Sequence, residues 1–227
     1  MTASVEDQIQ AVWVEPTQFD PYRHGPPFLP PGSPPVKLAA DQKAKVQGWV
    51  KQAHGDTEQI VVEMAKDYGG GLGYLSALLV YLRAAATVHQ THHWQTRGQS
   101  FFGDHLLFER LYNGTVPGVD SLGERVVGRG NPGLVEPVRQ AKHLAWCIAK
   151  CYDGSKTDEG PDGMVRISLH VEAHVLGAIK IVLRELGQAG LLSDGTENLL
   201  QDLADKHEEF VYLLKQRADA ASYSYGR

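Results

Sequence analysis

Long stretches of this chain repeat apolar residues at the spacing of an α-helix, and this periodicity limits the fold more than any other feature. In residues 165–187 the repeating positions are Val165, Leu169, Leu176, Ile179 and Leu183. Residues at this spacing line one face of a helix. No segment of useful length alternates apolar and polar residues, so we expect almost no β-sheet. The sequence therefore predicts an all-α fold.

Glycine-rich and loop-rich breaks divide the periodic stretches into separate helices. We expect long helices over residues 74–96, 100–127, 165–187 and 194–219, and a shorter helix at 137–151. Two adjacent long helices, a connection of about 35 residues and two more long helices are the layout of a ferritin-like four-helix bundle with one long crossover. The short helix would lie in that crossover.

The segments that flank the bundle differ from it in composition. Eight of the twelve prolines lie between Pro16 and Pro35, which predicts an extended tail over residues 1–38. Residues 39–70 are expected to form a helical extension, residues 71–220 the bundle, and residues 221–227 a C-terminal tail.

Charge and apolar content exclude several classes of protein. The net charge is −5, so the chain lacks the overall basic field that attracts nucleic acid or an anionic membrane. The longest apolar stretch, Leu75 to Val88, is interrupted by Arg83 and is too short to span a bilayer. Because no signal peptide is visible, we expect a cytoplasmic protein. Its two cysteines, Cys147 and Cys151, are then expected to be reduced and buried.

The chemistry-bearing residues are concentrated between residues 92 and 125, where the candidate metal ligands are His93, His105, Glu109, Asp120 and Glu124. His105 and Glu109 share a helix face, as do Asp120 and Glu124, because each pair is four residues apart. Glu109 and Asp120 are about 16 Å apart along a helix axis. Since metal–ligand bonds measure about 2.0–2.2 Å, the five residues cannot bind one ion within one chain.

A two-fold axis between two subunits would resolve this separation. It would bring His93, His105 and Glu109 of one subunit opposite Asp120 and Glu124 of its partner, twice in each dimer. The pattern therefore predicts an intersubunit site. Imidazole and carboxylate ligands suit iron, zinc or manganese, and we favour iron.

The same stretch resembles the Dps family, the mini-ferritins also called DNA-binding proteins from starved cells. The resemblance rests on HWQTRG at 93–98, Phe101, the pair His105 and Glu109, and DSLGER at 120–125. All spacings of the family signature are kept. The match is specific at about ten positions within 33 residues, and the order of helices extends it loosely over 72–219.

The resemblance implies a ferroxidase that oxidises Fe(II), preferentially with hydrogen peroxide, at the five residues named above. It further implies storage of ferric mineral in a hollow dodecamer built from two-fold dimers, and protection against oxidative damage. Zinc would be a substitute for iron in the site. Trp94 matches the tryptophan beside the family's centre and would act as a redox relay.

Two features depart from the family pattern. Residue 109 is Glu where Asp is commoner, which lengthens the side chain by one methylene group. Pro117 and two glycines predict a fault at residues 113–118, in a helix that the family keeps continuous. A kink there would displace Asp120 and Glu124.

Other histidines are weaker candidates for a metal role. His89 and His92 lie near the motif, but His92 points about 100° away from His93 around the helix. His170 and His174 are four residues apart and are expected mainly to pack or to lie in an interface. The absence of a Glu-x-x-His motif from the last two long helices argues against a di-iron site inside the bundle. Asp205, His207, Glu208 and Glu209 are expected to form a charged face.

Two alternatives to the ferroxidase remain open. A non-enzymatic assembly protein would keep the ligands for zinc or as polar interface residues. A nucleoid-coating protein would bind DNA, but the proline-rich tail is net acidic, so we expect DNA binding to be weak or absent.

Overall fold

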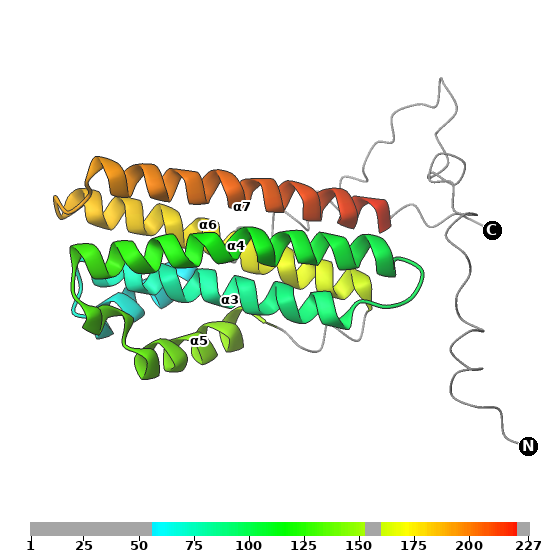
Figure 1. The fold of residues 1–227 in the computed structure, drawn as a ribbon, viewed down its shortest axis with the longest axis horizontal. Coiled ribbons are helices and arrows are strands. Elements are labelled where there is room, and N and C mark those ends of the chain that lie inside the picture. The colour runs from blue at the N-terminus through cyan, green and yellow to red at the C-terminus, as the bar shows by residue number, and fades with distance from the viewer. Residues whose placement is uncertain (1–55, 153–159, 222–227) are drawn as a thin grey trace, which may run out of the picture. The chain divides into compact units, whose positions relative to one another are not determined.

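The computed structural model describes residues 56–152 and 160–221, and within them every regular element is helical (Figure 1). This confirms the all-α prediction for that part of the chain. The four long helices are α3 (Gly73–Gln95), α4 (Phe101–Arg129), α6 (Pro161–Gln188) and α7 (Asp194–Ala221). A further helical segment covers residues 56–67. The proline-rich tail, the first part of the 39–70 extension and residues 222–227 lie outside the described residues.

The four long helices pack side by side as a bundle (Figure 1). α3 contacts α4 and α6, and α7 contacts α6 and α4, so each long helix has two long neighbours. Leu78, Leu82, Leu122, Ile179 and Leu200 are completely buried between them or nearly so. Burying a side chain of this size stabilises the fold by about 1.5–3 kcal/mol, which makes this apolar interior the main source of cohesion.

The most apolar helix, α3, is covered on a third side by a shorter helix. α5 (Pro137–Cys151) packs against α3 on the outside of the bundle. The apolar stretch Leu75 to Val88 therefore belongs to a helix enclosed by protein, with Arg83 donating to Gln140 Oε1 of α5 over 3.3 Å. Among the described residues, no helix is both long and apolar enough to cross a membrane.

The connection from α4 to α6 carries the short helix that the sequence predicts. A 3₁₀ turn, η2 (Pro132–Val135), precedes α5. The Glu136 side chain accepts hydrogen bonds from the backbone N–H groups of Val138 (2.9 Å) and Arg139 (2.7 Å), while Pro137 occupies the first turn. Capping side chains and proline at this position are both favourable helix starts, so local sequence defines where α5 begins.

The expected fault in α4 is wrong, because α4 is helical throughout residues 113–118 despite Pro117. The two glycines have a packing role instead. A Cβ atom added at Gly114 would lie 2.6 Å from Cζ of Phe210, and one at Gly118 would lie 2.6 Å from Cδ2 of Leu203. They therefore mark the points where α4 approaches α7 closely, and the cost of Pro117 is confined to one missing backbone donor.

Replacing Gly114 by valine tests this interpretation. The added side chain would collide with the fully buried Phe210 ring, so we expect Gly114→Val to lower the free energy of unfolding by about 1–3 kcal/mol. Gly103→Val is the matched control, because Gly103 also lies in α4 but no atom comes within 4 Å of its added Cβ. Chemical denaturation of both variants measures the difference, and equal stability of the two would contradict the proposed close contact.

Candidate functional site

The structure brings two of the predicted ligands, His93 and His105, into direct contact. His93 lies in the last turn of α3 and His105 lies near the start of α4, and a short connection joins the two helices. The ring centroids are 3.7 Å apart and the rings are stacked. Gly98 allows the tight connection, because its φ of +83° is a conformation that favours glycine.

A reciprocal pair of hydrogen bonds sets the orientation of both rings. Nδ1 of His93 is 3.0 Å from the backbone oxygen of His105, and Nδ1 of His105 is 3.0 Å from the backbone oxygen of His93. Because a carbonyl oxygen only accepts, each Nδ1 carries the proton and donates it. In the neutral rings the lone pair is then on Nε2. Histidines that bind metals are commonly oriented in this way, so both rings are prepared to donate from Nε2.

Glu109 lies one helical turn after His105 on α4 and is half-buried. The spacing of four residues places it on the same helix face as His105. The structure thus brings the two imidazoles together, while the use of Glu109 as a third ligand beside them stays a prediction.

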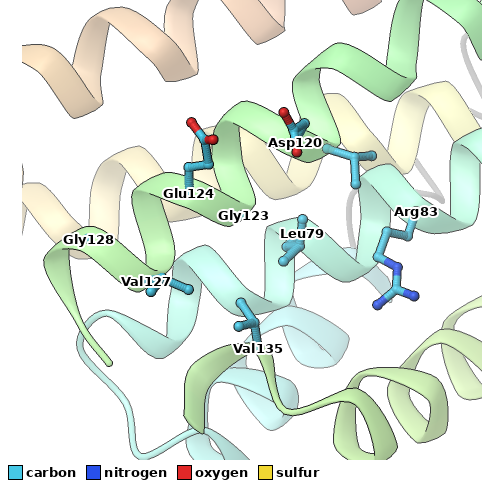
Figure 2. Close-up of a pocket in the computed structure, with 9 residues that line it drawn as sticks. Leu79, Arg83, Asp120, Gly123, Glu124, Val127, Gly128 and Val135 are labelled. Carbon is cyan, nitrogen blue, oxygen red and sulfur yellow. The ribbon is translucent and has the colours of Figure 1, made fainter. Parts of the chain in front are cut away.

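The other two candidates, Asp120 and Glu124, lie farther along α4 and are exposed. They line a groove together with Leu79 and Arg83 of α3 and Val135 of η2. Figure 2 shows the two carboxylates one helical turn apart on α4. Acidic side chains beside an apolar groove at the surface are a favourable surface for a second protein chain.

Within one chain the structure does not bring these two groups together. Eleven residues of the continuous helix α4 separate Glu109 from Asp120, a rise of about 16 Å. In the part of the chain that the structure describes, no three His, Cys, Asp or Glu side chains already converge as a set that holds a metal ion. The grouping of the five residues into two half-sites, one from each of two subunits, stays a prediction.

Trp94 follows His93 in α3, and 69% of its side chain is exposed. Its role as a redox relay stays a prediction.

A second polar cluster, not predicted from the sequence, lies inside the bundle and is centred on Glu172 of α6. Its Oε1 atom is 2.6 Å from Nε2 of His89 on α3, and its Oε2 atom is 2.5 Å from Nδ1 of His207 on α7. Ser168 Oγ joins the cluster at 3.2 Å from Nδ1 of His89 and 2.9 Å from Nδ1 of His92. All of these side chains are buried. We name them the Glu172 cluster.

The expectation that His207 belongs to a charged surface is wrong. His207 lies on the same face of α7 as Leu203, Phe210 and Leu214, all of which are buried. A helix face is defined by steps of three or four residues, and His207 occupies one of these steps. That position on the apolar face was the signal available in the sequence.

The electrostatics of the cluster favour an ionised carboxylate. Burial by itself would raise the pKa of Glu172, but the charge and hydrogen bonds of His207 and His89 together lower this pKa to about 2. Burial, and to a smaller extent His89, lower the pKa of the neighbouring His92 to about 3, so His92 stays neutral. The cluster is thus a buried charge held by imidazoles from two other helices.

Comparison with known proteins gives no family assignment. No protein-family model matches the sequence, and a search of curated proteins found no match either. Function must therefore be inferred from the motif spacing and the side-chain geometry.

Substitution of Glu172 by glutamine tests the role of the buried charge. An amide cannot accept from both imidazoles, so we expect Glu172→Gln to lower the free energy of unfolding by about 3–5 kcal/mol at neutral pH. The unfolded carboxyl takes up a proton near its ordinary pKa of 4.5, the folded one only near 2. The stability that the ionised form contributes is therefore fully present above about pH 4.5 and is lost as the pH falls towards 2.

Chemical denaturation at several pH values measures this effect. The difference between the wild-type protein and Glu172→Gln should narrow below pH 4.5. Glu208→Gln is the control, because Glu208 is an exposed carboxylate on α7 and its replacement should change stability by less than about 0.5 kcal/mol. A difference that does not depend on pH would show that Glu172 is not ionised in the folded protein.

Proposed function

We propose that this protein is a Dps-like ferroxidase, which oxidises Fe(II) with hydrogen peroxide at sites shared between two subunits. The observation that carries this proposal is the reciprocal hydrogen bonding of His93 and His105, which leaves an Nε2 lone pair on each of two adjacent imidazoles. Together with Glu109 they supply nitrogen and oxygen donors of the kind that iron binds.

The separation of the half-sites along α4 supports a shared site. A two-fold axis that runs the α4 helices of two subunits antiparallel would place Asp120 and Glu124 of one subunit opposite His93, His105 and Glu109 of the other. The exposed apolar side chains of Phe101, Phe102, Leu106, Val116 and Val127 on α4 agree with such an interface, because a partner chain would remove them from water.

The arrangement of the long helices agrees with a ferritin-like bundle, in which the chain crosses the bundle once between the second and third long helices. In the Dps family, which the sequence resembles, the subunits assemble into a hollow shell. We accordingly propose a homo-oligomer built from two-fold dimers, with a dodecamer as its expected size and ferric mineral stored inside.

The proposed chemistry requires little of the protein beyond binding and orientation. Two ferrous ions, the substrate, each give up one electron, and hydrogen peroxide takes both electrons as its O–O bond breaks to give two hydroxide ions. Pairing the electrons in one site avoids release of a hydroxyl radical. The carboxylates of Glu109, Asp120 and Glu124 offset the growing positive charge on the oxidised iron.

Subunit complementation tests the function and the sharing of the site together. His105→Ala and Asp120→Ala should each abolish Fe(II)-dependent loss of hydrogen peroxide when present in every subunit. In a dimer that pairs one subunit of each variant, one site loses both groups and the other keeps all five ligands. Random assembly of equal amounts should therefore restore about a quarter of the wild-type sites.

The two variants are co-expressed for this measurement, so that mixed dimers form during folding, and peroxide loss is followed after purification. Asp202→Ala is the control, because Asp202 is an exposed carboxylate of α7 outside the motif. No recovery in the mixture would exclude a shared site. Wild-type peroxide consumption by the two single variants would exclude the ferroxidase function of these residues.

A further inference from the structure

Two pairs of strong metal-binding side chains face each other on α5 and α6, away from the ferroxidase motif. Cys147 and Cys151 are four residues apart on α5, and His170 and His174 are four residues apart on α6. This spacing places each pair on one face of its own helix. α5 packs against α6, so the tertiary structure brings together two pairs that are well separated in sequence.

The four side chains are close neighbours. Cys147 and His174 lower the pKa of the Cys151 thiol against the effect of burial, which places both side chains beside Cys151. Nε2 of His174 is 3.1 Å from Nε2 of His170. Cys147, Cys151 and His174 are buried, which confirms the prediction of buried cysteines, and His170 is half-buried.

A hydrogen bond outside the group orients the central histidine. Nδ1 of His174 is 2.7 Å from the hydroxyl oxygen of Thr57, in the helical segment 56–67. A neutral His174 that donates this Nδ1 proton presents its Nε2 lone pair towards His170 and Cys151. Metal-binding histidines characteristically have such a second hydrogen bond.

A buried hydroxyl beside the group supplies an independent observation. Tyr81 of α3 is 1% exposed, and within the described residues its Oη atom has no hydrogen-bond partner. Its ring is stacked on that of His174, with centroids 6.2 Å apart. Burial raises the pKa of the Tyr81 hydroxyl, and Cys147 and Cys151 raise it further, which places the two thiols near it. A buried polar atom without a partner calls for an explanation, and an ion bound among the neighbouring side chains is one that would supply it.

We propose that Cys147, Cys151, His170 and His174 form a second metal site, which binds Zn²⁺ with two sulfur and two nitrogen ligands. Two nitrogens bound tetrahedrally to zinc at about 2.0–2.1 Å would be about 3.3–3.4 Å apart. The 3.1 Å between the two Nε2 atoms requires only a few tenths of an ångström of adjustment. As they stand, the four side chains do not yet converge on one point, so binding of the ion would break the contact between the two imidazoles.

The ligand types separate this site from the ferroxidase motif. Thiolate and imidazole ligands select zinc, whereas the motif at residues 93–124 offers only nitrogen and oxygen. Four protein ligands leave zinc no open position, so the site is structural and would fasten the crossover helix α5 to α6. It does not depend on the proposed ferroxidase activity.

Cobalt substitution is the direct test. The full-length protein is treated with a chelator under reducing conditions and titrated with Co²⁺ alone. We expect thiolate-to-cobalt charge-transfer bands in the near ultraviolet and the visible bands of a tetrahedral ion, with the thiolate bands corresponding to one ion per chain. Cobalt bound at the nitrogen and oxygen motif would add no thiolate band. Because Cys147 and Cys151 are the only cysteines in the sequence, any thiolate band must come from this pair. Addition of Zn²⁺ should remove the bands.

Variants identify the ligands. Cys151→Ser should weaken the charge-transfer band, the double variant Cys147→Ser/Cys151→Ser should abolish it, and the double variant His170→Ala/His174→Ala should abolish the tetrahedral visible bands. His143→Gln is the matched control, because His143 also lies in α5 but bonds to Asp67 instead. His105→Ala should keep the cobalt–thiolate bands, so that failure of the ferroxidase proposal and failure of this one are distinguishable.

X-ray absorption at the zinc edge reports the atoms bound to zinc. It is measured on the wild-type protein loaded with zinc, so the result does not depend on whether a variant folds. Two sulfur and two nitrogen neighbours would support the site. A shell of nitrogen and oxygen only, absence of a thiolate band at stoichiometric Co²⁺, or wild-type visible bands in the double histidine variant would overturn the proposal.

Discussion

A carboxylate buried at the centre of the bundle is the constraint on which the arrangement of the helices depends. An ionised Glu172 inside an apolar core is tolerated only because His89 of α3 and His207 of α7 bond to its two oxygens. The cluster therefore specifies how three long helices meet. Ser168 also hydrogen bonds to His92, which directly precedes His93 in α3. The core thereby helps to orient the end of α3 that carries His93.

The continuity of α4 from Phe101 to Arg129 determines how far apart the candidate ligands of the motif lie. Close approach to α7 at Gly114 and Gly118 keeps this helix regular through Pro117. A regular helix holds Asp120 and Glu124 far from His93 and His105, and it also holds them at a constant distance. If a two-fold axis runs two such helices antiparallel, the carboxylates on one helix lie opposite the histidines beside the other, which is the basis of the proposed shared site.

The described residues divide metal-binding side chains by chemistry and by depth. The nitrogen and oxygen donors of the motif lie at or near the surface of α3 and α4. The sulfur and nitrogen donors of α5 and α6 are mostly buried against α3 and residue Thr57. An accessible metal site suits catalysis, whereas an enclosed site with four protein ligands suits a structural ion. This is why we propose a catalytic role for the motif on α3 and α4 and a structural role for the cysteines and histidines of α5 and α6.

Helical periodicity was enough to predict the four long helices and the short helix between α4 and α6, because these depend on spacing along one helix. The same spacing places Glu109 on the helix face of His105, and their common use as ligands stays a prediction. Helical periodicity could not predict the contacts between helices. Cys151 meets His174, and Glu172 meets His89 and His207, only after packing has joined segments far apart in sequence. The role of Gly114 was hidden for the same reason, since a glycine that loosens an isolated helix is a point of close contact once Phe210 lies against it. Helix formation depends on residues close together in the sequence, whereas the hydrogen-bond partners of a buried polar group depend on how the helices pack in the tertiary structure.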